Sequence, residues 1–305
     1  MIVPRDSPSR IPRDEHGLPR GRTRLHATDS ITRRIGGDVR NLLMAGSTFT
    51  LQVAHPVVGA GVAEHSAYQR DPWTRLRDID ASGRRFVWTD EDASRKEGAR
   101  LRRIHRGIHG VMPDGTRYHS LDPHGYGWVH TVFLDMMIRQ AELYDAPLTR
   151  DEQERLFLEW YEGALFLGLR DADLPAGLDE YQHRFAEALE RVQPSNSVID
   201  HLLGDRRGPP PPEGFPRIAA PLFPFLVRPF GLTAQWLAVA GLPAAFRARL
   251  APEHRWTDRD EALHRRVREF VRALVPRLPL ALRLLPDARA TPFIIEERSA
   301  PAAAF

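Results

Sequence analysis

The 305-residue chain contains no cysteine, and this absence excludes several kinds of site. Without thiols there is no disulfide framework, no thiolate zinc site, no iron–sulfur cluster and no cysteine nucleophile. A haem held by a thiolate ligand is excluded for the same reason. Any metal must be held by imidazole nitrogens or by oxygen donors, so the thirteen histidines are the side chains to consider first.

Long apolar runs and the motifs of several enzyme classes are also missing. The stretch 218–242 is apolar, but it contains Arg228 and three prolines, whereas a membrane span needs about 20 predominantly apolar residues. We therefore expect it to cover the core, with at most a peripheral membrane contact. The chain has no glycine-rich phosphate loop, no His-Glu-x-x-His helix and no Gly-x-Ser-x-Gly elbow, which disfavours hydrolase chemistry.

Charge of neither sign dominates the chain. Lys and Arg number 43 and Asp and Glu 40, for a net charge of +3, and the two signs are interspersed. Without a long basic block or an interleaved aromatic platform, nucleic acid is not expected as a partner. Arg33-Arg34 precedes an apolar run, but Asp38 and Arg40 interrupt it where an export signal would have its apolar core. We therefore expect a cytoplasmic protein, and the sequence leaves its oligomeric state open.

Helical patterning runs through most of the chain, which is 42% hydrophobic and has no long alternating strand pattern. We expect an all-α protein with a single globular helical domain at 31–290, a flexible N-terminal arm at 1–30 and a C-terminal tail at 291–305. Prolines, glycines and capping residues mark the helix ends. The expected helices are 31–68 with a break at His55-Pro56, 73–86, 90–111, 123–144, 149–169, 178–192, 232–240, 244–249 and 258–274, with an irregular proline-rich connector at 208–230.

The helix expected over 90–111 carries a group of basic side chains. Arg102, His105 and His109 are spaced three and four residues apart, so on a helix they share one face. Such a face could meet a metal or an anionic cofactor, because imidazole is an iron ligand and guanidinium pairs with carboxylates such as haem propionates. A solvated basic face with one histidine at its edge explains the same spacing.

A second segment, 127–138, is apolar nearly all round and is expected to be the buried centre of the domain. His130 and Asp135 are then buried polar groups that need partners. His130 either bonds to a backbone carbonyl or lines a pocket as a ligand. His55 lies in another apolar run, and helix capping or core contacts explain it and His65 as well as catalysis does.

The order of several short motifs resembles one known family, the MpaB-like and rubber oxygenase (latex-clearing protein) catalytic domains, over roughly residues 31–290. Each motif is weak alone, and the combination is specific. The motifs are Gln52-Val53-Ala54-His55-Pro56, Gly61-Val62-Ala63-Glu64-His65-Ser66, Asp71-Pro72, Arg75-Leu76, Arg102-x-x-His105, Gly115-x-x-Tyr118, Asp122-Pro123, Trp128-Val129-His130, Leu278-Pro279 and Arg283-x-x-Pro286.

The resemblance implies an all-helical fold with a globin-like core and a b-type haem bound by one axial histidine. The Arg-x-x-His motif, followed four residues later by a basic residue, assigns that iron ligand to His105. Arg102 and His109 then fall on its two flanking positions as cofactor-binding residues.

A further arginine, Arg75, matches one that the rubber enzymes carry upstream of the axial histidine. The rubber enzymes have threonine four residues after this arginine, and a lysine just before that threonine can cap the iron. This chain departs from the pattern, with Ile79 and Asp78 at those two positions.

The resemblance therefore suggests a haem b-dependent oxygenase that acts with dioxygen on a small apolar substrate, with isoprenoid and lipid-like molecules as candidates. His105 would bind the iron, while Arg75 and Arg102 would pair with propionates or orient the distal pocket. His130 and His55 would line the cavity or transfer protons. Two alternatives stay open: a non-catalytic helical haem or lipid carrier, and a haem-free structural member of the family.

Overall fold

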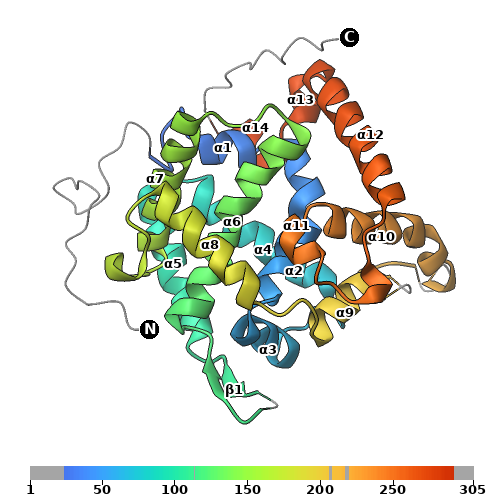
Figure 1. Cartoon of the computed structure of the whole chain (residues 1–305), viewed down its shortest axis with the longest axis horizontal. Coiled ribbons are helices and arrows are strands. Elements are labelled where there is room, and N and C mark those ends of the chain that lie inside the picture. The colour runs from blue at the N-terminus through green and yellow to red at the C-terminus, as the bar shows by residue number, and fades with distance from the viewer. Residues whose placement is uncertain (1–23, 113, 206–207, 217–219, 292–305) are drawn as a thin grey trace.

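The computed structural model describes residues 24–112, 114–205, 208–216 and 220–291, and these form helices packed around a central helix (Figure 1). The first elements are α1 (Ile31–Gly36), η1 (Val39–Met44), α2 (Ala45–Val53), α3 (Pro56–His65), α4 (Pro72–Val87), α5 (Glu91–His105), β1 (His109–Val111) and β2 (Arg117–His119). The all-α fold class is confirmed, while the globin-like core remains a prediction.

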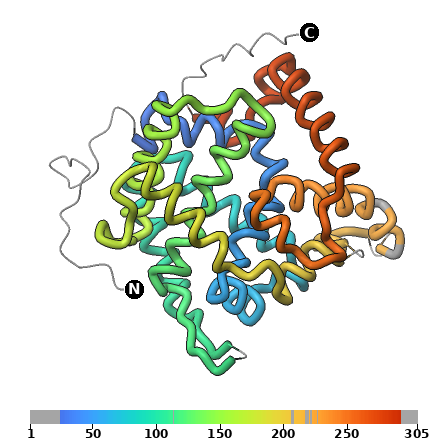
Figure 2. The backbone as a smooth tube through the Cα atoms, viewed as in Figure 1, coloured from blue at the N-terminus to red at the C-terminus, as the bar shows by residue number. Residues whose placement is uncertain are grey.

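The second half of the chain is also helical, and the tube in Figure 2 shows its C-terminal helices along one side of the molecule. Its elements are α6 (Pro123–Tyr144), α7 (Arg150–Phe166), η2 (Asp171–Asp173), α8 (Leu178–Arg191), α9 (Ser197–Gly204), η3 (Ala220–Leu222), α10 (Phe223–Ala240), α11 (Ala244–Arg247), η4 (Pro252–His254), α12 (Asp258–Leu274), η5 (Val275–Arg277), α13 (Leu280–Arg283) and α14 (Pro286–Ala290).

Side-chain caps explain why several helices begin where the sequence predicts. The Asp90 carboxylate accepts a hydrogen bond from the Ala93 amide, and Asp122 accepts from the amides at the start of α6. Thr149 forms a capping box with Glu152. These contacts satisfy amide groups that have no partner within the helix, so the starts of α5, α6 and α7 agree with the sequence prediction.

Helix α6 is the buried centre that its apolar sequence predicts. It contacts α1, α2, α3, α7 and α12. The Trp128 indole donates to the Leu51 carbonyl at 2.9 Å, which joins α6 to α2. At the other end, the fully buried Tyr144 lies with its hydroxyl 2.9 Å from a ring nitrogen of His264 in α12. Helices far apart in sequence are therefore fixed to α6 by buried polar contacts.

The helix predicted to extend to Val111 ends six residues earlier, so that part of the prediction is wrong. After His105 the chain turns and forms the antiparallel hairpin of β1 and β2, in which His109 pairs with His119. Gly110 permits this course, because a Cβ there would lie 2.5 Å from the Glu64 carboxylate and 2.8 Å from the Tyr118 ring. Close backbone approach, rather than helical periodicity, decides the structure of this segment.

The connector predicted at 208–230 is also partly wrong, because α10 already begins at Phe223. Pro224 lies in its first turn, where the missing amide hydrogen costs no helical bond. Pro229 lies inside the helix and removes one backbone bond there. Packing of the later half of α10 against α2, where Ala238 meets Gly46, holds a helix that the prolines alone would disfavour.

Residues 24–30 pack against the helical body, although the sequence predicts a flexible arm as far as residue 30. Leu25 is buried, and its amide donates to the Glu162 carboxylate at 2.8 Å. Ser30 and the first amides of α1 donate to the buried Glu159 carboxylate. The remainder of the predicted arm, 1–23, and the predicted tail from 292 onward lie outside the described residues.

Candidate active site around His105

His105, the last residue of α5, has an imidazole with one nitrogen engaged. Its Nδ1 lies 2.8 Å from the Leu101 carbonyl oxygen. Because a carbonyl only accepts, Nδ1 must carry the hydrogen, and Nε2 keeps its lone pair. Burial lowers the pKa of His105, and the nearby charges of Arg75 and Arg100 lower it further. The ring is therefore neutral at physiological pH, in the tautomer that binds a metal through Nε2.

Helix α4 runs antiparallel to α5 and places Arg75 near His105. The Ser82 hydroxyl donates to Glu97 at 2.6 Å, and the Ser94 hydroxyl donates to the Phe86 carbonyl at 2.5 Å. Continuing this antiparallel pairing along α4 brings Arg75 level with the end of α5. The effect of its charge on the His105 imidazole agrees with that position. The structure thus brings together two residues that lie thirty positions apart.

Apolar side chains remain uncovered along the same part of α4 and α5. Leu76 is 58% exposed, and Ile79 in α4 and Ile104 in α5 are also exposed. Helix α4 is amphipathic, yet none of its described residues is buried. Exposed apolar side chains and Arg75 beside a neutral imidazole could accept an apolar ligand with an anionic group, such as a haem. The Arg100 guanidinium on α5 is paired with the buried Glu97 carboxylate at 2.5 and 2.8 Å.

Tyr126, in the first turn of α6, packs edge-on against His105 and was missed by the sequence analysis. The two ring centroids lie 5.5 Å apart at an interplanar angle of 71°. Its buried hydroxyl has no hydrogen-bond partner among the described residues. Burial raises the pKa of Tyr126 to about 12, so the hydroxyl keeps its proton. A buried hydroxyl without a partner costs free energy unless a ligand pairs with it, and its position after Asp122-Pro123-His124-Gly125 could have indicated it.

Arg102 and His109 do not stand in the arrangement that the helical spacing predicts. The Arg102 guanidinium donates to the Phe166 carbonyl at 3.2 Å and fastens α5 to the end of α7. His109 is exposed on β1, and its ring stacks on His119 with centroids 6.2 Å apart. Arg102 and His105 both lie on α5 three residues apart, whereas His109 does not share their helical face, because the helix ends before it.

His130 is engaged in a reciprocal contact between α6 and α7. Its Nε2 donates to the Trp160 carbonyl at 2.8 Å, and the Trp160 indole donates to the His130 carbonyl at 2.9 Å. The two rings are stacked with centroids 4.9 Å apart. Burial lowers the pKa of His130 to about 4, so the ring is neutral. This geometry is the backbone-bonded arrangement, one of the two possibilities the sequence left for His130.

His55 lies at the N-cap of α3, next to the first turn of α6. Its Nδ1 is buried without a hydrogen-bond partner among the described residues. Its Cε1 would lie 3.4 Å from a Cβ built on Gly125, and its ring lies 6.4 Å from that of Trp128. Burial lowers its pKa, which the Asp122 carboxylate raises in part. His55 and Tyr126 thus leave two buried polar atoms unpaired near the start of α6.

Comparison with known protein families matches residues 33–273, more than three quarters of the chain, to the family described as ER-bound oxygenase mpaB/B'/Rubber oxygenase, catalytic domain. The chain belongs to this family. The comparisons with curated proteins and with solved structures found no match to the chain. Membership of the MpaB/rubber oxygenase family supports oxygenase activity in general, with a substrate and dioxygen as reactants.

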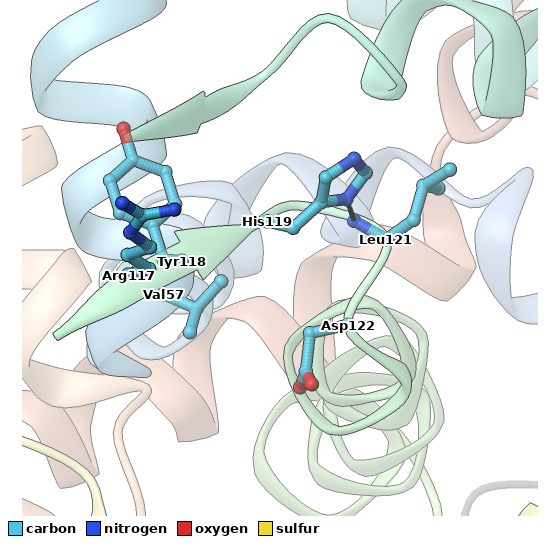
Figure 3. Close-up of a pocket in the computed structure, with 6 residues that line it drawn as sticks. All are labelled: Val57, Arg117, Tyr118, His119, Leu121 and Asp122. Carbon is cyan, nitrogen blue, oxygen red and sulfur yellow. Dashed lines mark hydrogen bonds between the residues drawn. The ribbon is translucent and has the colours of Figure 1, made fainter. Parts of the chain in front are cut away.

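A pocket of about 400 Å³ lies beside this region of the MpaB/rubber oxygenase domain, between α3, β2 and the start of α6 (Figure 3). None of the predicted site residues lines it. Ser120 lies in sequence between the lining residues His119 and Leu121, and its hydroxyl donates to the His105 carbonyl at 2.7 Å. The lining residues are Val57, Arg117, Tyr118, His119, Leu121 and Asp122.

Ligands for a bare metal ion are not gathered in the described part of this MpaB/rubber oxygenase domain, where no group of three or more His, Asp and Glu side chains is placed to hold one. A haem iron needs only one protein ligand on its proximal side, so this finding bears on ion sites alone. Among the described residues, no helix is both long enough and apolar enough to cross a bilayer.

Proposed function

We propose that this chain is a haem b-dependent oxygenase, with His105 as the single axial ligand and a small apolar, lipid-like molecule as substrate. The observation that carries the proposal is the His105 imidazole, whose Nδ1 is bonded to the Leu101 carbonyl so that Nε2 is available. A carbonyl partner of this kind fixes the orientation of a ligating histidine and raises its basicity. Bound there, the haem would supply the activation of dioxygen.

The residues around His105 suit the two parts of a haem. Arg75 would pair with a propionate, since its charge acts on the His105 imidazole, whereas the Arg100 guanidinium is already paired with the Glu97 carboxylate at 2.5 and 2.8 Å. Leu76, Ile79 and Ile104 would supply apolar contacts. Arg102 would act mainly by holding α5 against α7, because its guanidinium already donates to a carbonyl there.

Two buried polar atoms are candidates for handling the substrate or a proton. The Tyr126 hydroxyl, protonated because burial raises its pKa to about 12, would donate a hydrogen bond to a ligand at this site. The unpaired Nδ1 of His55 could accept a proton, since burial lowers its pKa and keeps the ring neutral. We propose that His130 acts by positioning α6 against α7, through its contacts with Trp160.

A haem-free structural role is the second candidate, and Asp78 favours it. Burial lowers the pKa of Arg75, and the nearby Asp78 charge opposes that shift. In that position Asp78 would partly neutralise the cation that a propionate needs. The same charge, however, would hold the Arg75 guanidinium in place before a cofactor binds.

The test is the visible absorption spectrum of protein produced with ample haem precursor, beside His105→Ala. His109→Ala is the matched control, because His109 is an exposed histidine on the hairpin that follows. We expect a haem band in the wild type and in the control, and its loss in His105→Ala with unchanged helical circular dichroism. No haem band in wild-type protein that also lacks iron would overturn the proposal and favour the haem-free role. A haem band without turnover would favour a carrier.

A further inference from the structure

The first half of α10 presents a wide apolar arc to solvent. Phe225 and Phe230 are 72% and 77% exposed, and Leu232 is also exposed. Leu222, the N-cap residue immediately before the helix, is exposed too. At about 100° per residue on a helix, these four side chains fall within one arc of roughly 160°. Pro229 lies inside the arc and is exposed too. Exposed apolar residues gathered on one helix face indicate a binding surface.

Residues beyond the two edges of the arc attach α10 to the protein. Phe223 is buried, and its ring packs edge-on against Phe215 and Trp73 at centroid distances of 4.9 and 6.4 Å. The Gln235 amide donates to the Asp205 carbonyl at 2.7 Å. Figure 1 shows α10 at the edge of the molecule, with its later turns directed toward α2. The helix is thus attached at Phe223 and along its later turns, while the side chains of the arc are exposed.

Arg228 is the one charged residue in the sequence of α10. Arg228 is exposed at the border of the arc, about 40° beyond Leu232 by helical geometry. The sequence contains no Asp or Glu between Glu213 and Glu253, while it contains four arginines there. A basic residue at the border of an apolar helix face is the pattern of helices that lie in the interface of an anionic bilayer. A symmetric dimer through this face would instead bring like charges together.

From this combination we infer that the first half of α10 binds the surface of an anionic lipid bilayer, with Phe225, Phe230, Leu222 and Leu232 entering the interface and Arg228 at the headgroups. The helix lies in the interface and does not cross the bilayer. Binding of this kind depends on both apolar burial and surface charge.

The location of the arc has a consequence for the candidate active site. Trp73, which packs against Phe223, belongs to the first turn of α4, and Arg75 and the exposed Leu76 follow it directly. An apolar substrate dissolved in a bilayer would therefore reach the protein on the side where α4 begins. This step rests on the proposed function, whereas lipid binding itself does not.

Co-sedimentation with vesicles tests the inference, using phosphatidylcholine alone and phosphatidylcholine mixed with phosphatidylserine. We expect wild-type protein to sediment with the mixed vesicles. The double variant Phe225→Ser/Phe230→Ser should bind at least about tenfold more weakly, because transfer of two phenyl rings into the interface is lost. Arg228→Glu should weaken binding to mixed vesicles more than to neutral ones. Phe270→Ser is the matched control, since Phe270 is 63% exposed on α12.

Three outcomes would overturn the inference. The first is wild-type protein that remains in the supernatant with both kinds of vesicle. The second is an equal loss of binding in Phe270→Ser, which would indicate non-specific adsorption of exposed apolar side chains to the vesicles. The third is a wild-type dimer in gel filtration that the double variant dissociates, without vesicle binding, which would assign the face to a second copy. None of these readouts involves haem, so a negative haem spectrum leaves them unaffected.

Discussion

The contact between α5 and α7 positions His105, and a pair of glycine substitutions can test it. Gly98 lies in α5 against the end of α7, where an added Cβ would overlap the backbone carbonyl of Phe166. That carbonyl also accepts the hydrogen bond from Arg102. A Gly98→Ala chain can keep α5 helical only by moving it away from α7. Gly83, in α4, has nothing within 4 Å of the corresponding position.

The two substitutions carry the same helical gain, so their difference isolates the clash. Alanine in a helix interior is favoured over glycine by roughly 0.5–1 kcal/mol, and Gly83→Ala should raise the free energy of unfolding by about that amount. Forcing extra atoms against packed backbone costs typically about 1–3 kcal/mol, so Gly98→Ala should come out less stable than wild type. Urea unfolding followed by circular dichroism measures both. Equal stability of the two variants would refute the close approach of α5 to α7.

Two further predictions concern buried polar groups. Burial raises the pKa of Glu159 to about 7, so its contribution to stability is present below its unfolded pKa and is lost as the pH rises toward 7. Glu159→Gln should therefore make the unfolding free energy fall less steeply between about pH 4.5 and 7, by a slope that corresponds to at most one bound proton. An unchanged slope in urea unfolding at several pH values would contradict this. Tyr126→Phe removes a hydroxyl with no partner among the described residues, so its free energy of unfolding should stay within about 0.5 kcal/mol of wild type while the haem spectrum shifts. A large loss of stability with no spectral change would show that the hydroxyl is structural.

The starts of several helices could be predicted from the sequence because side-chain caps are local interactions. Asp90, Asp122 and Thr149 each offer a side-chain oxygen to amides one turn later, and this interaction is determined within a few residues of chain. The break at His55-Pro56 is local in the same sense, because proline disfavours helix at the residue before it. Such features need no knowledge of the rest of the fold.

Features that depend on distant contacts could not be read in this way. The end of α5 at His105 depends on the hairpin, whose Gly110 packs on Glu64 and Tyr118. Helix α10 forms through Pro229 because its later turns pack on α2. At the site, the spacing of Arg102 and His105 could be seen in sequence, but the Phe166 carbonyl that engages Arg102 lies on another helix. Tyr126 meets His105 only because the β1–β2 hairpin returns the chain so that the start of α6 lies against the end of α5.

The electrostatics around His105 favour an anionic ligand over a free cation. Arg75 and Arg100 both depress the pKa of the imidazole, and Tyr126 stays neutral because burial raises its pKa. The Arg100 guanidinium is paired with the buried Glu97 carboxylate at 2.5 and 2.8 Å, and the Asp78 charge acts on Arg75. The positive charge of Arg75 beside a neutral imidazole favours a ligand with an anionic group of its own, and this is the property by which a haem would fit the proposed site.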